Sequence, residues 1–86
     1  MESLNKELTI KHNFHSRYVK NFINKVSTIK SDVYFEKNDR RINAKSIIGL
    51  LSLNVVIGDV VGVYVLGNNR DLVENDMSKV IEILGE

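Results

Sequence analysis

Residues 7–26 read ELTIKHNFHSRYVKNFINKV, and the spacing of their apolar residues changes partway through. Polar and apolar residues alternate at 7–11, a pattern that is typical of a half-buried strand. The apolar residues at positions 19, 22, 23 and 26 then follow the i, i+3, i+4, i+7 spacing of an amphipathic helix, with lysine and asparagine between them. This stretch therefore predicts a strand followed by a helix of about three turns.

The rest of the chain continues to alternate between strand and helix patterns. The predicted elements are strands at 32–36, 40–43 and 58–66, a short helix at 45–53, and a closing helix whose apolar spacing runs from 73 to 84. Asn38-Asp39 is a two-residue turn candidate between the first two of these strands. Asn68, with Asp71 three residues later, has the arrangement of an N-cap for the closing helix.

The predicted order of elements is therefore β-α-β-β-α-β-α. A chain of 86 residues is too short for a second hydrophobic core, and elements in this order are most simply arranged in two layers. We expect a single domain over residues 1–86 with an α+β fold. In this open-faced, two-layer β-sandwich, three helices cover one face of a four-stranded, mostly antiparallel sheet, and the other face meets water.

The composition limits the chemistry that this chain can perform. It contains no cysteine, which excludes disulfides, thiolate-bound zinc, iron–sulfur clusters and cysteine nucleophiles. No apolar run reaches the roughly 18 residues that span a bilayer, and the first residues lack the apolar core of a signal peptide. We therefore expect a small, soluble, cytoplasmic protein that does not insert into membranes.

The formal net charge of +1 conceals an uneven distribution along the chain. Residues 1–45 contain ten basic and five acidic residues, whereas residues 46–86 contain two basic and six acidic residues. A general nucleic-acid-binding domain usually has an overall basic excess, which is absent here, so we expect no nucleic-acid partner. A local basic surface that meets an acidic protein fits this distribution better.

His15 and Arg17 stand at the start of the first predicted helix and are the main candidates for chemistry. The first turn of a helix offers unpaired N–H groups and a positive dipole end, and arginine adds donors that match phosphate oxygens. Because neutral histidine is a nucleophile near pH 7, His15 could hold a phosphoryl group there. The alternative is an ordinary solvated histidine on the surface.

Two neighbours of His15 carry further expectations. Asn13 could adopt a left-handed backbone conformation at the entry to the helix, which asparagine tolerates better than most residues. His12 forms His-x-x-His with His15, but no third ligand is close in the sequence. We therefore expect no metal site.

The short middle helix carries more apolar surface than one core face needs. At roughly 100° per residue, Ile47, Ile48 and Leu51 share one arc, while Leu50 and Leu53 share another. Either the helix is largely enclosed, or the first three residues form an exposed docking patch. We favour the docking patch.

Ser46 stands at the start of the same helix, where a serine side chain can cap free N–H groups. The functional alternative is phosphorylation, because the helix dipole tolerates a phosphate at this end. A phosphate on Ser46 would add about two negative charges beside the docking patch.

With these residues in view, the chain resembles the HPr family, the histidine-containing phosphocarriers of the bacterial phosphoenolpyruvate-dependent sugar phosphotransferase system. The resemblance covers nearly the whole chain, including the order of elements. Its histidine region, 13–19, keeps a histidine and an arginine at the expected positions. Its most specific part is the serine region, Asp39-Arg40 through Lys45-Ser46-Ile47-Ile48-Gly49-Leu50-Leu51-Ser52-Leu53-Asn54.

This resemblance implies a role for several residues. His15 would take a phosphoryl group from enzyme I and pass it to the IIA domains of sugar permeases, with Arg17 supporting that group. Ser46 would correspond to the regulatory site that HPr kinase uses in Gram-positive bacteria. The docking patch would match apolar positions of the family's shared partner surface, to which we add a lysine of the first helix. The expected partner-binding residues are thus Ile47, Ile48, Leu51 and Lys20.

The histidine region departs from the family pattern, which usually reads glycine, an aliphatic residue, histidine, alanine, arginine, proline and a small residue. Here Asn13 replaces the glycine, Phe14 the aliphatic residue and Tyr18 the proline, while Val19 enlarges the small position. Tyr18 restores an N–H group that proline lacks, and it adds a bulky ring beside the active loop. Asn24 replaces a basic residue that is often found later on this helix face. We expect either slower phosphotransfer or a different choice of partners.

The leading hypothesis is a monomeric phosphocarrier that needs no cofactor and is not itself a turnover catalyst. The alternative is a regulatory HPr-like module that acts through phospho-Ser46 on a transcription factor or metabolic enzyme. A third possibility is a divergent paralogue that binds partners without being phosphorylated. The presence of both His15 and Arg17 argues against a purely regulatory relative that has lost the active histidine.

Overall fold

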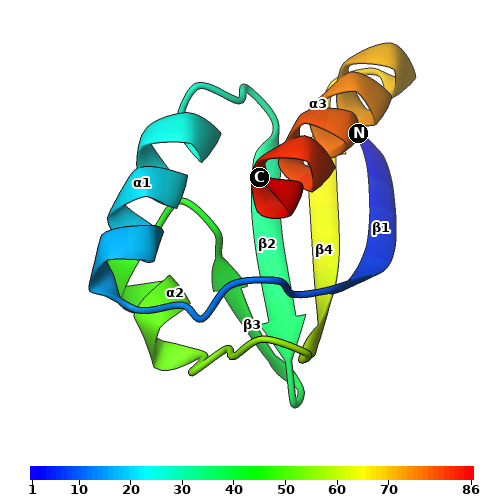
Figure 1. Cartoon of the computed structure of the whole chain (residues 1–86). Coiled ribbons are helices and arrows are strands. Elements are labelled where there is room, and N and C mark those ends of the chain that lie inside the picture. Colours follow the sequence, from blue (N-terminus) through cyan, green and yellow to red (C-terminus); the bar gives the residue numbers. More distant parts are fainter.

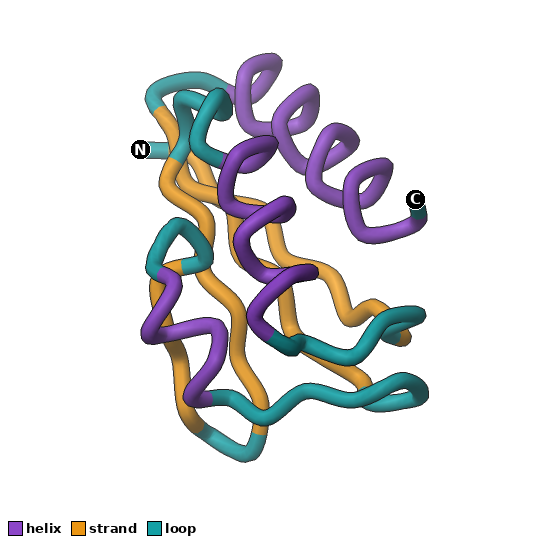
Figure 2. Tube along the Cα trace, turned by 60° about the vertical axis from the view of Figure 1, so that its left-hand side comes forward, coloured by secondary structure: helices purple, strands orange, loops and turns teal.

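The strands and helices follow the predicted order along residues 1–86, all of which are described by the computed structural model. The elements are β1 (Glu2–Thr9), α1 (Ser16–Val26), β2 (Asp32–Lys37), β3 (Arg40–Asn43), α2 (Ile47–Ser52), β4 (Val60–Gly67) and α3 (Arg70–Gly85). The strands form one sheet in the order β1-β4-β2-β3, in which every neighbouring pair is antiparallel (Figure 1). Helices α1 and α3 lie side by side over the sheet, and α2 lies next to the start of α1 (Figures 1 and 2). The predicted α+β fold is confirmed.

The core lies between the helices and one face of the sheet. Along β4, Val61, Val63 and Val65 are fully buried, whereas the residues between them point to the opposite face and are partly exposed. This alternation follows from the two-residue period of a strand. The three valines belong to the same core cluster as Phe22 of α1 and Phe35 of β2, whose ring centroids are 5.5 Å apart.

Several element boundaries differ from the sequence-based expectations. β4 begins at Val60 rather than at residue 58, and α2 spans Ile47–Ser52 rather than 45–53. β1 begins at Glu2, earlier than predicted, and pairs along its whole length with β4. Main-chain hydrogen bonds in an edge strand require no strict alternation of side chains, so the hydrophobic pattern underestimates the length of β1. The N-cap of α3 is Asn69 rather than Asn68, because Asn69 Oδ1 accepts the Leu72 N–H at 2.8 Å.

Two further expectations concern a turn and the hydropathy of the helices. The turn at Asn38-Asp39 is confirmed, because both residues have positive φ angles, 52° and 63°, as the central residues of a type I′ hairpin require. None of the helices is both long and apolar enough to cross a bilayer.

Gly67, at the end of β4, is packed too closely to accept a larger residue. A Cβ atom there would lie 2.8 Å from Ser31 Oγ and 2.9 Å from Val73 Cγ2. We expect Gly67→Ala to lower the free energy of unfolding by about 1–3 kcal/mol, because overpacking forces neighbouring groups to move. Urea denaturation measures this change. Gly85→Ala is the matched control, since nothing lies within 4 Å of a Cβ at that position. Equal unfolding midpoints for the two variants would contradict this close packing.

Candidate functional site

His15 is the N-cap residue of α1 and is exposed. Its backbone is extended, with φ −94° and ψ 172°, and its N–H donates to the Asn13 carbonyl at 3.0 Å. The ring Nδ1 accepts a hydrogen bond from the Tyr18 N–H at 3.4 Å. In a neutral imidazole, the nitrogen that accepts such a bond has the lone pair, which assigns the ring proton to Nε2. The nucleophilic lone pair of His15 therefore faces the first turn of α1.

The first turn of α1 can bind an anion next to His15 Nδ1. Ser16 and Arg17 are the first two helical residues, so their N–H groups have no acceptor within the helix. This turn contains no acidic residue that would neutralise the positive end of the helix dipole. Arg17 is exposed and takes part in none of the five ion pairs of the fold, and the same holds for Lys20, one turn further along. The guanidinium of Arg17 is therefore free to bind phosphate oxygens.

The ring of Tyr18 lies in a row of aromatic side chains. Its centroid is 4.7 Å from that of His12 and 5.5 Å from that of Phe14, and both pairs are stacked. Burial of the phenol, together with the negative charge of Glu86, raises the pKa of Tyr18, so this group stays neutral at physiological pH. Tyr18 thus contacts His15 through its backbone N–H, while its side chain packs against neighbouring rings.

His12 lies between the ring of Tyr18 and the end of the chain at Glu86. Its Nε2 is hydrogen-bonded to the backbone oxygen of Glu86, and its ring stacks on Tyr18. No three His, Asp or Glu side chains converge in the fold. Both histidines therefore contact Tyr18, His12 through the tyrosine ring and His15 through the tyrosine backbone N–H.

The side chain of Asn13 forms a hydrogen bond between the loop that precedes α1 and the loop between α2 and β4. The expected left-handed conformation is wrong, because positive φ angles occur only at other residues. Instead, Asn13 Oδ1 accepts the Ile57 N–H at 2.9 Å, and the adjacent Phe14 N–H donates to the Val55 carbonyl at 2.9 Å. The amide side chain of Asn13 thus accepts a hydrogen bond from a backbone N–H of the loop between α2 and β4. This contact does not require a left-handed backbone at Asn13.

Ser46 is the N-cap residue of α2. Its Oγ accepts the Gly49 N–H at 3.0 Å, so the side chain caps the helix. The neighbouring Lys45 gives no free cation for a phosphate, because its Nζ donates to the carbonyls of Ile29 and Ser31 at 2.6 and 2.9 Å. Phosphorylation of Ser46 stays a prediction.

Helix α2 divides its apolar residues between the core and the surface. Leu50 and Leu53 are buried, whereas Ile48 is 82% exposed and Ile47 is 40% exposed. Leu51 lies between these extremes and packs against the core. The alternative of a largely enclosed helix does not agree with these exposures. Within the docking patch (Ile47, Ile48 and Leu51), the two isoleucines are therefore exposed and Leu51 is half-buried, and the use of the patch by partners stays a prediction.

Two further apolar residues are exposed, and neither belongs to the predicted docking patch. Val56 and Ile57 lie in the loop between α2 and β4, next to Asn13. The sequence feature that could have drawn attention to them is a run of three branched apolar residues, 55–57, between a predicted helix and a predicted strand. Such a run usually indicates burial, and here only Val55 is buried.

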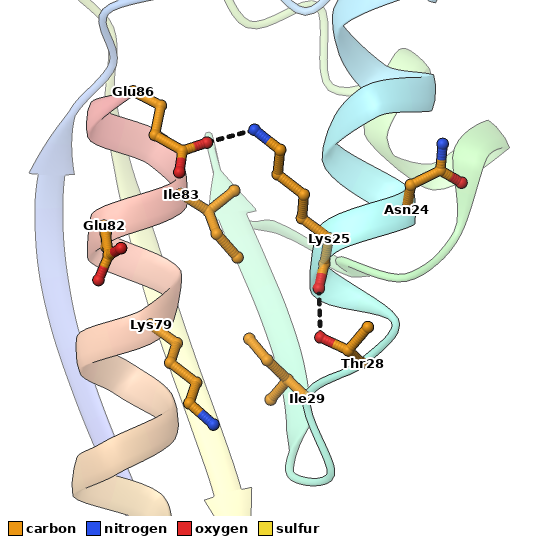
Figure 3. A pocket seen from close by; sticks show the side chains of 8 residues that line it. All are labelled: Asn24, Lys25, Thr28, Ile29, Lys79, Glu82, Ile83 and Glu86. Atoms are coloured by element: carbon orange, nitrogen blue, oxygen red, sulfur yellow. Dashed lines mark hydrogen bonds and ion pairs between the residues drawn. The ribbon is translucent and has the colours of Figure 1, made fainter.

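A groove lies between the C-terminal end of α1 and helix α3 (Figure 3). Its volume is about 390 Å³, and its charged lining residues are Lys25, Lys79, Glu82 and Glu86. Lys25 and Glu86 form an ion pair across it (Figure 3). Because this pair bridges the two helices and charges of both signs line the groove, it is a junction between helices rather than a candidate site.

The chain is similar to a family of known proteins. A family model described as "PTS HPr component phosphorylation site" matches residues 4–82. The HPr-like protein Crh from Bacillus subtilis (strain 168) is 35% identical over 64 residues, which cover 74% of this chain and 75% of that protein. The phosphocarrier protein HPr from Neisseria meningitidis serogroup A is 40% identical over 55 residues, which cover 64% of this chain and 62% of that protein.

Solved structures share the fold. HPr from Bacillus anthracis matches with a TM-score of 0.85 and 20% identity, over 98% of this chain and 99% of that chain. A crystal structure of Crh from Bacillus subtilis, described as a dimer with a swapped domain, matches with a TM-score of 0.73 and 28% identity, over 99% of this chain and 94% of that chain. That dimer contrasts with the monomer that we expect for this chain. The monomeric state therefore stays a prediction, which analytical ultracentrifugation can check.

Proposed function

The chain belongs to the HPr family of phosphocarriers, and from this membership we propose that it accepts a phosphoryl group from enzyme I on His15 and passes it to sugar-specific IIA domains. The observation that supports this most directly is the exposed N-cap position of His15, whose Nδ1 faces the first turn of α1. In this role the chain carries the group between cytoplasmic partners and is not a turnover catalyst by itself.

In the proposed transfer, the Nδ1 lone pair of His15 attacks phosphorus while the bond between phosphorus and the donor atom breaks. An N–P bond forms, and the ring proton stays on Nε2. The Tyr18 N–H, which donates to Nδ1 before the reaction, can then donate to a phosphoryl oxygen. A hydrogen bond to a charged group contributes about 1.5–3 kcal/mol, so the first-turn N–H groups and Arg17 can stabilise the phosphoryl charge.

The partner-binding surface of the proposed carrier consists of the docking patch together with Lys20. Apolar residues that become buried at the centre of an interface supply much of its stability, and Ile48 is the most exposed member of the patch. The exposed Lys20 and Arg17 would attract acidic side chains at the rim. Phosphorylation of Ser46 by HPr kinase would place about two negative charges beside the patch and oppose docking.

Incubation with enzyme I and phosphoenolpyruvate tests this proposal. We expect the mass of the chain to increase by one phosphoryl group, which is lost in acid and on addition of a IIA domain. His15→Ala abolishes the increase. The matched control His12→Ala keeps it, because His12 contacts the ring of Tyr18 and the backbone oxygen of Glu86, whereas the N–H that faces His15 Nδ1 belongs to the Tyr18 backbone. A wild-type chain that is never phosphorylated, or a His15→Ala variant that still is, would rule out the carrier role.

A regulatory HPr-like binding module is the second candidate function. It is favoured by the position of Ser46 beside the docking patch and by the similarity to the HPr-like protein Crh. Phospho-Ser46 would then bind a transcription factor or a metabolic enzyme. A parallel incubation with HPr kinase and ATP, read by the same mass measurement, separates the two functions. For a regulatory module we expect an acid-stable phosphate on Ser46 in this incubation, and little or no phosphate on His15 in the incubation with enzyme I.

A further inference from the structure

The loop between α2 and β4 holds two bulky apolar side chains in water, Val56 and Ile57. The loop is nevertheless braced, because Asp59 Oδ2 accepts the Val56 N–H at 2.9 Å and pairs with Lys37 Nζ at 2.8 Å. Lys37 also donates to the Asn54 carbonyl at 2.8 Å. The hydrogen bond from Lys37, followed by that from the Val56 N–H, lowers the pKa of Asp59, so the brace stays charged at neutral pH. Branched side chains on a braced loop lose little conformational freedom when a partner covers them.

The same loop lies against the loop that carries His15, and Asn13 joins the two. The Asn13 carbonyl accepts the His15 N–H at 3.0 Å, and Asn13 Oδ1 accepts the Ile57 N–H at 2.9 Å. A protein that delivers a phosphoryl group must bring its donor atom to His15 and therefore covers the surface around it. A specific interface occupies about 800 Å² on each partner, which is wide enough to include Ile57.

We propose that Val56 and Ile57 form a second apolar contact for enzyme I, beside the docking patch, and that Asn13 positions this contact relative to His15. The inference rests on the proposed function, in which enzyme I is the partner that every loading of His15 requires. The surface of enzyme I would then have an apolar depression for Ile57 in addition to the one that receives Ile48. This second contact selects an enzyme I whose surface is apolar at that place.

Titration of enzyme I into the isotope-labelled full chain, without phosphoenolpyruvate, tests this contact by NMR. We expect the amide signals of Val56 and Ile57 to shift together with that of Ile48. We expect Ile57→Ser to raise the Kd for enzyme I about fivefold, and to raise KM for phosphorylation with kcat unchanged, because binding is lost and the chemistry is not. The matched control is Val60→Ser: Val60 is 54% exposed, against 62% for Ile57, but it points to the helix-free face of the sheet. Urea denaturation checks that both variants are folded.

The outcomes separate this inference from the proposed function. If Ile57→Ser binds as tightly as wild type and both are phosphorylated, the contact is wrong and the carrier role stands. If Ile57→Ser weakens binding but the wild-type chain is never phosphorylated, the contact stands and the carrier role is wrong. A wild-type chain that does not bind enzyme I contradicts both. An equal loss in Val60→Ser, or a change only in the self-association of Ile57→Ser, also overturns the contact.

Discussion

Replacing Tyr18 with proline will move the equilibrium of phosphoryl transfer away from His15 by about tenfold. The Tyr18 N–H is directed at His15 Nδ1, with its nitrogen 3.4 Å away, and so can reach an oxygen of a phosphoryl group on that atom. A hydrogen bond to a charged oxygen contributes about 1.5–3 kcal/mol, and about 1.4 kcal/mol corresponds to a factor of ten. Proline has no N–H, so the variant loses this donor. The chain with tyrosine should therefore hold its phosphoryl group more firmly, and pass it on more slowly, than the variant.

The equilibrium is measured by incubating each chain with enzyme I and limiting phosphoenolpyruvate and determining the phosphorylated fraction from intact mass. Tyr18→Ala is the matched control, because it removes the ring that stacks on His12 and Phe14 but keeps the N–H. We expect Tyr18→Ala to stay close to wild type in this equilibrium. Equal shifts for the proline and alanine variants would assign the effect to the ring and contradict the role of the N–H.

The fold could be predicted from the sequence wherever one face of an element is buried. The alternation of Val61, Val63 and Val65 with partly exposed residues follows directly from packing one face of β4 on the core. The early start of β1 could not be predicted in this way, because β1 is an edge strand held by main-chain pairing with β4. The shift of the α3 cap from Asn68 to Asn69 has a similar cause, since two adjacent asparagines carry the same local signal.

The candidate site could be predicted only where local rules apply. Both His15 and Ser46 cap helices that begin at the next residue, and helix-start patterns are visible in the sequence. The contact between Asn13 and Ile57 joins residues that are 44 positions apart, so it depends on the approach of two loops that no local pattern describes. For the same reason, the sequence did not indicate that Ile57 is exposed beside the His15 loop.

A negative charge at position 46 will lower kcat/KM for the loading of His15 by enzyme I about 100-fold. Ser46→Asp places a carboxylate beside Ile47 and Ile48, which the proposed partner must cover. Leaving a charge unpaired in an interface costs about 2–5 kcal/mol, and about 2.7 kcal/mol corresponds to a factor of 100. Lys45 cannot neutralise this charge without giving up its bonds to two backbone carbonyls.

The matched control is Ser46→Asn, because asparagine caps a helix about as well as aspartate but carries no charge. We expect Ser46→Asn to be loaded within about threefold of wild type, and stopped-flow measurements with phosphorylated enzyme I give both rates. Helix α2 should stay intact in both variants, because either side chain can accept the Gly49 N–H that Ser46 Oγ binds. If the aspartate and asparagine variants are loaded equally fast, enzyme I does not cover the start of α2, and Ile47 and Ile48 are then not the residues on which it docks.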